Sequence, residues 1–234
     1  MSSVAIIPAR GGSKRIPRKN IKDFCGKPII AWSIEAALKS GCFDKVIVST
    51  DDQEIADISR QHGAEVPFIR PEKLSDDYAG TLPVICHALE WLLNDGIKVD
   101  RVCCIYATAP FLRPSDLRSG FEYLVQDESL DFIFSATKYS FPIQRALKIN
   151  SMGRVEMFQP EHFETRSQDL EEAYHDAGQF YWGTSQAWIE QKAIFSSNSA
   201  AHLLPTERVQ DIDTPEDWER AEVMYQVMKT QGAV

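Results

Sequence analysis

Short β-branched runs alternate with segments of helical spacing along the first half of the chain, and this alternation constrains the fold most strongly. Residues 4–8 (Val-Ala-Ile-Ile-Pro) predict a buried strand that ends in a loop. Residues 29–39 have helical spacing, and residues 44–50 predict the next strand. Strands that alternate with helices form a mainly parallel sheet with helices on both faces. The sequence therefore predicts an α/β fold.

The length of 234 residues suits one domain. No apolar run approaches the ~20 residues of a membrane-spanning helix, so we expect no membrane partner. Near residue 140 the rhythm changes, and residues 141–157 alternate apolar and polar side chains around a turn at 150–153, as in a hairpin. We predict a single domain over residues 1–234 with a hairpin insertion at 140–180. Self-association and a simple surface excursion both fit this insertion.

The N-terminus and the cysteines indicate a cytoplasmic protein. Pro8 ends the first apolar run at once, which does not fit an export signal. The five cysteines are an odd number and lack the spacing of a metal site. Reduced, mostly buried thiols of a cytoplasmic protein are the simplest interpretation.

Charge is distributed unevenly along the chain. The net charge of −9 argues against general affinity for nucleic acid. Residues 10–27 nevertheless hold seven basic residues and one acidic residue, a local sum of +6 that leaves −15 for the rest of the chain. The basic residues are Arg10, Lys14, Arg15, Arg18, Lys19, Lys22 and Lys27.

This basic segment directly follows the first predicted strand and contains Gly11, Gly12 and Ser13. Small residues let backbone N–H groups approach phosphate oxygens, and Arg and Lys neutralise them. Loops at the carboxyl ends of strands bind ligands in open α/β sheets. The segment therefore predicts a phosphate-binding site, with a solvated basic loop as the alternative.

Two common phosphate-binding motifs are absent. The pattern G-x-G-x-x-G does not follow the first strand, and Pro28 follows Gly26-Lys27 where a P-loop needs Ser or Thr. Neither a dehydrogenase nor a P-loop kinase is indicated.

An acidic couplet, Asp211 and Asp213, lies just before the last predicted helix, which begins at Thr214-Pro215. In an extended chain, side chains two residues apart leave on the same face. Two close carboxylates repel each other unless a cation lies between them, and Mg²⁺ is usually held by one or two carboxylates and substrate phosphates. A helix-cap feature is the alternative, but beside a phosphate site the couplet predicts Mg²⁺ binding.

A long and specific set of motifs runs from the first strand to the last helix. These motifs lie at residues 7–21 (Ile-Pro-Ala-Arg-Gly-Gly-Ser-Lys-Arg-Ile-Pro-Arg-Lys-Asn-Ile), 26–28, 48–51, 70–71 and 211–214. They resemble the CMP-sialic acid synthetase family, the cytidylyltransferases that make CMP-activated nonulosonic acids. The resemblance implies a Rossmann-like nucleotide-binding sheet, a hairpin insertion that helps to build a homodimer, CTP and a nonulosonic acid as substrates, and Mg²⁺ as cofactor.

The resemblance also implies roles for individual residues. Arg10 and Lys19 would hold the CTP phosphates and act in catalysis, and Asp211 and Asp213 would bind Mg²⁺. The implied nucleotide site comprises Ala9, Arg10, Gly11, Gly12, Ser13, Lys19, Asn20, Arg70 and Thr81.

Two departures from the sialic acid members select a branch of the family. Residues 105–110 read Ile-Tyr-Ala-Thr-Ala-Pro instead of Leu-Gln-Pro-Thr-Ser-Pro, and residues 175–178 read His-Asp-Ala-Gly instead of Arg-Pro-Asn-Gly. Both segments, and residues 179–183, resemble the members that use pseudaminic acid. The implied sugar contacts are Tyr106, Arg166, His175 and Gln179. Tyr106 and His175 would serve equally well as core groups.

The implied reaction is attack by the anomeric hydroxyl of pseudaminic acid on the α-phosphorus of CTP, with release of pyrophosphate. Such transfers depend mainly on positioning and charge stabilisation. No side chain stands out from the sequence as a general base. The alternatives are sialic or legionaminic acid as the acceptor, and a nucleotide-binding protein without catalysis.

Overall fold

The structure is a computed structural model that describes residues 2–76 and 78–232. Its strands are β1 (Ser3–Pro8), β2 (Asp23–Phe24), β3 (Lys27–Pro28), β4 (Lys45–Ser49), β5 (Arg101–Ile105), β6 (Phe132–Lys138), β7 (Leu147–Ile149), β8 (Val155–Met157), β9 (Tyr174–Thr184) and β10 (Ser199–Leu203). Its α-helices are α1 (Ile29–Ser40), α2 (Gln53–Gln61), α3 (Thr81–Asn94), α4 (Pro114–Gln126), α5 (Ser185–Ile189) and α6 (Pro215–Thr230). Two of its 3-10 helices matter for the site, η1 (Lys19–Ile21) and η6 (Thr206–Arg208).

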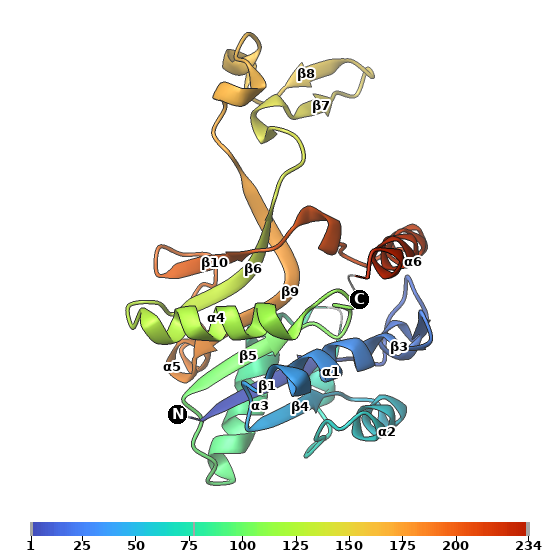
Figure 1. Ribbon diagram of the computed structural model, residues 1–234, viewed down its shortest axis with the longest axis vertical. Helices are drawn as coiled ribbons and strands as arrows, with labels where there is room; N and C mark the ends of the chain where they lie inside the picture. Colours follow the sequence, from blue (N-terminus) through green and yellow to red (C-terminus); the bar gives the residue numbers. More distant parts are fainter. Residues whose placement is uncertain (1, 77, 233–234) are drawn as a thin grey trace.

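A six-stranded sheet with the order β10-β6-β9-β5-β1-β4 forms the centre of the molecule (Figure 1). The pairs β10/β6, β5/β1 and β1/β4 are parallel, whereas β9 is antiparallel to both β5 and β6. Five strands therefore share one direction and only β9 opposes them. The predicted mainly parallel α/β sheet is confirmed, and the carboxyl ends of β1, β4 and β5 meet at one edge.

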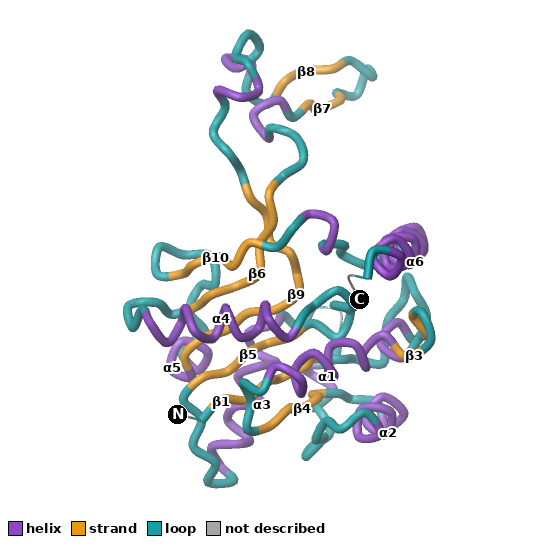
Figure 2. Tube along the Cα trace, in the orientation of Figure 1, coloured by secondary structure: helices purple, strands orange, loops and turns teal. Residues whose placement is uncertain are grey.

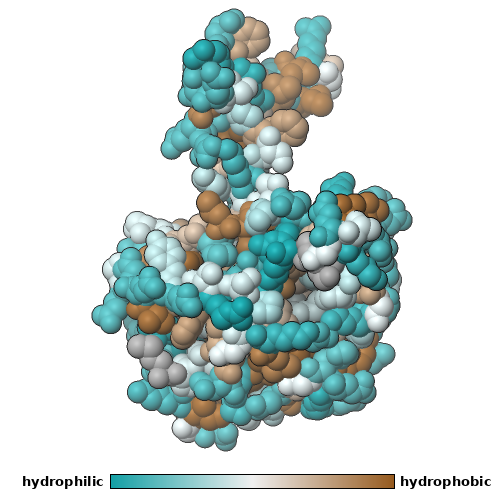
Figure 3. Space-filling model, in the orientation of Figure 1, coloured by the Kyte–Doolittle hydropathy of each residue, from teal (hydrophilic) through white to brown (hydrophobic). Residues whose placement is uncertain are grey.

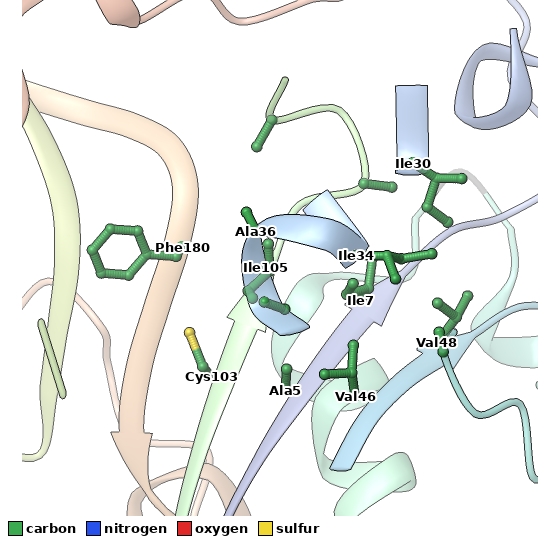
Figure 4. Packing of buried hydrophobic residues seen from close by; sticks show 14 of the residues in the cluster. Ala5, Ile7, Ile30, Ile34, Ala36, Val46, Val48, Cys103, Ile105 and Phe180 are labelled. Atoms are coloured by element: carbon green, nitrogen blue, oxygen red, sulfur yellow. The ribbon is translucent and has the colours of Figure 1, made fainter. Parts of the chain in front are cut away.

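Helices cover both faces of this sheet (Figure 2). Along β1, Ala5 and Ile7 pack in the cluster that contains Ile34 of α1, as Figure 4 shows, while Val4 and Ile6 pack in the opposite cluster with α3 and α5. All four β1 side chains are fully buried. A strand buried on both faces reads as a continuous apolar run, which explains the sequence of β1.

Gly183 in β9 illustrates how tightly the sheet is packed. A Cβ atom there would lie 2.5 Å from Cδ1 of Phe132 and 2.7 Å from Nε1 of Trp188. We expect Gly183→Ala to lower the free energy of unfolding by about 1 to 3 kcal/mol, because two large buried rings would have to move. Urea denaturation measures this, with Gly12→Ala as the matched control, since a Cβ at Gly12 meets nothing within 4 Å. Equal losses in the two variants would contradict the packing argument.

A long arm, residues 139–173, leaves the sheet after β6 and returns into β9 (Figure 1). It carries the antiparallel β7–β8 pair, in which Leu147 faces Met157, so the predicted hairpin is confirmed. The predicted insertion boundary at residue 180 is wrong, because the chain rejoins the sheet at Tyr174 and continues as one strand to Thr184.

None of the described helices combines the length and apolar character needed to cross a membrane. All five cysteines are free thiols. The last helix begins as predicted, with the Thr214 hydroxyl accepting from the Asp217 N–H and the Asp217 carboxylate accepting from the Thr214 N–H.

Candidate functional site

A cleft opens at the edge of the sheet where β1 and β5 end. Several of the residues predicted for the site line it together, namely Arg10, Lys19, Asn20, Arg70, Thr81 and Tyr106. They come from segments that are far apart in the sequence and meet because parallel strands bring their carboxyl ends to one edge. The predicted location of the site is therefore supported by the fold.

The glycine turn after β1 lies beside this cleft. The N–H of Ala9 donates to the Ser49 carbonyl (2.9 Å) and extends the β1/β4 ladder, and the N–H of Ser13 donates to the Gly11 carbonyl (3.0 Å). A Cβ on Gly11 would lie 2.7 Å from the Asp52 carboxylate, so only glycine fits there, whereas Gly12 faces open space. Ala9, Gly11, Gly12 and Ser13 thus shape the turn and do not themselves line the cleft.

Two of the side chains that line the cleft, Asn20 and Arg70, are polar and buried. Asn20 in η1 donates through Nδ2 to the Arg10 carbonyl (2.9 Å). The Arg70 guanidinium is almost fully buried, and its Nε lies 3.2 Å from the Ser75 hydroxyl. Burial lowers the pKa of Arg70, and the Asp51 carboxylate, 3.7 Å from its guanidinium, works against this shift.

Asp51 is a residue of this site that the sequence analysis did not single out. One of its carboxylate oxygens accepts from the Gly11 N–H at 3.0 Å and also faces Arg70. Its position directly after Ser49-Thr50, at the carboxyl end of β4, is the signal that would have identified it.

The basic segment and the acidic couplet are in contact. The Lys19 ammonium donates to the Ile212 carbonyl at 2.7 Å and lies 3.3 Å from the Asp213 carboxylate. The other Asp213 oxygen lies 2.7 Å from the Arg15 guanidinium. Residues separated by more than half the chain therefore form one charged surface beside the cleft.

The couplet supplies two carboxylates, the type of donor that binds Mg²⁺. Ile212 is fully buried, so the side chains of Asp211 and Asp213 leave the chain on the opposite side from it. Burial raises the pKa of Asp211, and the neighbouring Asp213 carboxylate raises it further. No group of three or more His, Cys, Asp or Glu side chains suited to a metal occurs among the described residues. Two carboxylates that repel each other fit an ion whose other ligands are phosphates and water.

Of the predicted sugar contacts, only Tyr106 lines the cleft. Its hydroxyl lies 3.2 Å from the Thr81 hydroxyl, its ring lies 5.3 Å from the Tyr181 ring, and burial raises its pKa. The Tyr181 hydroxyl in turn donates to the Asp176 carboxylate. Tyr106 therefore contacts both Thr81, which was predicted to bind the nucleotide, and Tyr181 of β9.

The other three predicted sugar contacts lie elsewhere in the chain. His175 packs against Tyr139 at the base of the arm, with ring centroids 4.7 Å apart. The Gln179 side chain points into the interior, is 3% exposed and donates to the Arg208 carbonyl at 2.6 Å. Arg166 lies on the arm, where it is exposed and pairs with Asp169 at 2.6 Å. Gln179 therefore has a structural partner in place of a sugar.

Known proteins resemble this chain over nearly its whole length. The chain is 51% identical to the pseudaminic acid cytidylyltransferase of Campylobacter jejuni subsp. jejuni serotype O:2, covering 97% of each chain. It is 35% identical to the CMP-N,N'-diacetyllegionaminic acid synthase of Legionella pneumophila, again covering 97% of each. Among solved structures, CMP:2-keto-3-deoxy-manno-octonic acid synthetase complexed with CTP has the same fold, with a TM-score of 0.72 and 18% identity over 97% of this chain and 99% of that chain.

The family model for cytidylyltransferases matches residues 4–229. This range includes the glycine turn, the cleft residues and the acidic couplet. The chain belongs to the cytidylyltransferase family.

Proposed function

We propose that the protein transfers CMP from CTP to the anomeric hydroxyl of pseudaminic acid and releases pyrophosphate. The observation that carries this proposal is the contact of Lys19, which lines the cleft, with Ile212 and Asp213, because it brings the predicted phosphate-binding segment and the predicted Mg²⁺ ligands together. Half of the residues are identical to those of a pseudaminic acid cytidylyltransferase over almost the full chain, which supports this acceptor.

In the proposed reaction the anomeric oxygen forms a bond to the α-phosphorus and gives up its proton to the solvent. The bond between the α-phosphorus and the oxygen that bridges to the β-phosphorus breaks, and this oxygen leaves with the pyrophosphate. Negative charge grows on the phosphate oxygens and on the leaving pyrophosphate. Arg10, Lys19 and Arg70 surround the cleft and would stabilise this charge. A Mg²⁺ ion held by Asp211 and Asp213 would supply further charge stabilisation when bound.

A pyrophosphate-release assay tests the activity and the acceptor together. With CTP and Mg²⁺, we expect release with pseudaminic acid and much slower release with sialic or legionaminic acid. Faster release with either of those sugars would assign a different acceptor. No release with any of them, together with tight CTP binding, would favour a nucleotide-binding protein without catalysis.

We also propose that the protein forms a homodimer through its arm. Hydrophobic surface, brown in Figure 3, is visible on the arm. The exposed apolar side chains of the arm include Phe141, Ile149, Met152, Phe158 and Phe163. Exposed apolar patches of this kind mark interaction surfaces. Because Arg166 lies on the arm and away from its own cleft, its predicted sugar contact would require the cleft of a second copy.

Light scattering after size-exclusion chromatography measures this association. We expect a dimer for the wild type and a monomer for Phe141→Asp, because Phe141 is 82% exposed and its loss of apolar contact would weaken the interface. Val223→Asp, on exposed α6, is the matched control and should remain dimeric. A monomeric wild type would contradict the proposed dimer.

As a user of CTP, the protein is expected to act in the cytoplasm.

A further inference from the structure

A buried ion pair lies directly behind the acidic couplet. Arg208, at the end of η6, is 7% exposed and donates through both terminal nitrogens to the carboxylate of Asp116, at 2.6 and 3.1 Å. Asp116 is 6% exposed and belongs to the first turn of α4. Buried ion pairs are weak evidence for stability, because desolvation of both charges offsets their attraction. Stability alone therefore does not explain why this pair is buried.

The pair remains charged in the interior. Burial would raise the pKa of Asp116, but the nearby His202 ring and the hydrogen-bonded, charged Arg208 hold it at about 2. The Arg113 N–H also donates to this carboxylate at 3.1 Å, and the His202 ring nitrogen lies 3.6 Å from it. Asp116 thus connects α4, β10 and η6.

Both residues of the ion pair are close in sequence to residues of the site. Ala107 and Thr108 line the cleft shortly before α4 begins. Arg208 precedes Asp211 by three residues, and its own carbonyl is held by the buried Gln179 amide of β9 at 2.6 Å. The chain is therefore fixed to the centre of the sheet immediately before the couplet.

The two carboxylates of the couplet are anchored differently. Asp213 contacts Lys19 and Arg15 through its side chain, and its N–H donates to Asp217 at 3.2 Å. The Asp211 carboxylate forms no hydrogen bond or ion pair with another residue in the part of the chain that the structure describes. The position of Asp211 consequently depends on the backbone on its two sides, which enters from Arg208 and continues to the buried Ile212.

We propose that Arg208, through its ion pair with Asp116, is a positioning residue that sets the Asp211 carboxylate in place for the metal ion, an inference that rests on the proposed Mg²⁺-dependent function. Gln179 belongs to the same arrangement, because it holds the Arg208 carbonyl. This role would account for a charge pair that is buried although burial of charges contributes little to stability.

The test replaces both partners at once, as Arg208→Met with Asp116→Leu. Replacing a buried ion pair by apolar side chains of similar volume is often neutral for stability, whereas removing one partner leaves a buried charge unpaired. We expect the double variant to stay folded, to lose only the roughly 1 kcal/mol of stability that the Asp116 cap on α4 contributes, and to keep its affinity for CTP without metal. Its affinity for Mn²⁺ in the presence of CTP, measured by electron paramagnetic resonance without any acceptor sugar, should fall about 10- to 100-fold.

Two further variants make the test decisive. Arg208→Lys keeps the charge but loses the two-pronged contact, so it should fold and bind Mn²⁺ with intermediate affinity. Lys192→Met with Asp131→Leu removes a partly exposed ion pair, 2.7 Å long, elsewhere in the fold and should bind Mn²⁺ like the wild type.

Unchanged Mn²⁺ affinity in folded Arg208→Lys and in the folded double variant would overturn the positioning role while leaving the proposed function intact. If Asp211→Asn also left the wild-type affinity unchanged, the proposed metal site itself would be wrong, and the positioning role would fall with it.

Discussion

Lys19→Ala is expected to lower kcat by about 100- to 1,000-fold, the scale found when one preorganised donor to a transition state is removed. The Lys19 ammonium contacts both the Ile212 carbonyl and the Asp213 carboxylate. It also lines the cleft, so it would face the CTP phosphates on one side and Asp213 on the other. Pyrophosphate release at saturating CTP and acceptor measures the change.

Lys22→Ala is the matched control for this variant. It removes the same charge from the same segment, but the Lys22 ammonium lies over the Trp218 ring, 4.2 Å from its centroid, and does not line the cleft. We expect its kcat to remain within about threefold of the wild type, since a lone exposed cation–π contact contributes only about 0.5 to 1 kcal/mol. Wild-type turnover in Lys19→Ala would refute its role in stabilising the transition state.

Asp213→Asn and Asp211→Asn are each expected to raise the Mg²⁺ concentration needed for half-maximal activity by about 10- to 100-fold or more. Loss of a group that merely supports a metal ligand already lowers metal affinity by this factor. The amide keeps the shape of each side chain but removes the negative charge that a hard cation requires. The affinity for CTP without metal should change much less. Titration of activity with Mg²⁺, and of CTP binding by calorimetry in a chelator, separates the two effects.

Asp217→Asn is the comparison for these variants, because Asp217 is an acidic residue near the couplet that caps α6. It should lower stability by about 1 kcal/mol through the cap while leaving the Mg²⁺ requirement close to that of the wild type. Equal Mg²⁺ requirements in Asp211→Asn, Asp213→Asn and the wild type would show that the couplet does not bind the ion.

The sequence predicts the parts of this fold that depend on local pattern. The buried run of β1, the stripe of α1 and the cap of α6 each carry a signal within a few residues. Helix α4 was not predicted, although Pro114 at its start and Asp116 two residues later are ordinary signals of a helix N-terminus. The antiparallel direction of β9 was not predicted either, because strand direction depends on where the arm returns.

The site, too, has features that the sequence predicts and features that only the structure shows. The glycine turn and the couplet are recognisable because each is a compact pattern of charge and small residues. The Arg208–Asp116 pair spans 92 residues and has no sequence pattern, so only the fold reveals it. Gln179 was predicted to contact the sugar, but its side chain is buried in the structure and donates to the Arg208 carbonyl.

The most direct measurement is a crystal structure of the protein with CTP and Mn²⁺, in which anomalous scattering locates the ion. We expect a Mn²⁺ peak between the carboxylates of Asp211 and Asp213 and the phosphates of CTP. We also expect those phosphates to contact Arg10, Lys19 and the turn at Gly11 and Gly12. A triphosphate bound away from that turn, or an ion that touches neither carboxylate, would contradict these expectations.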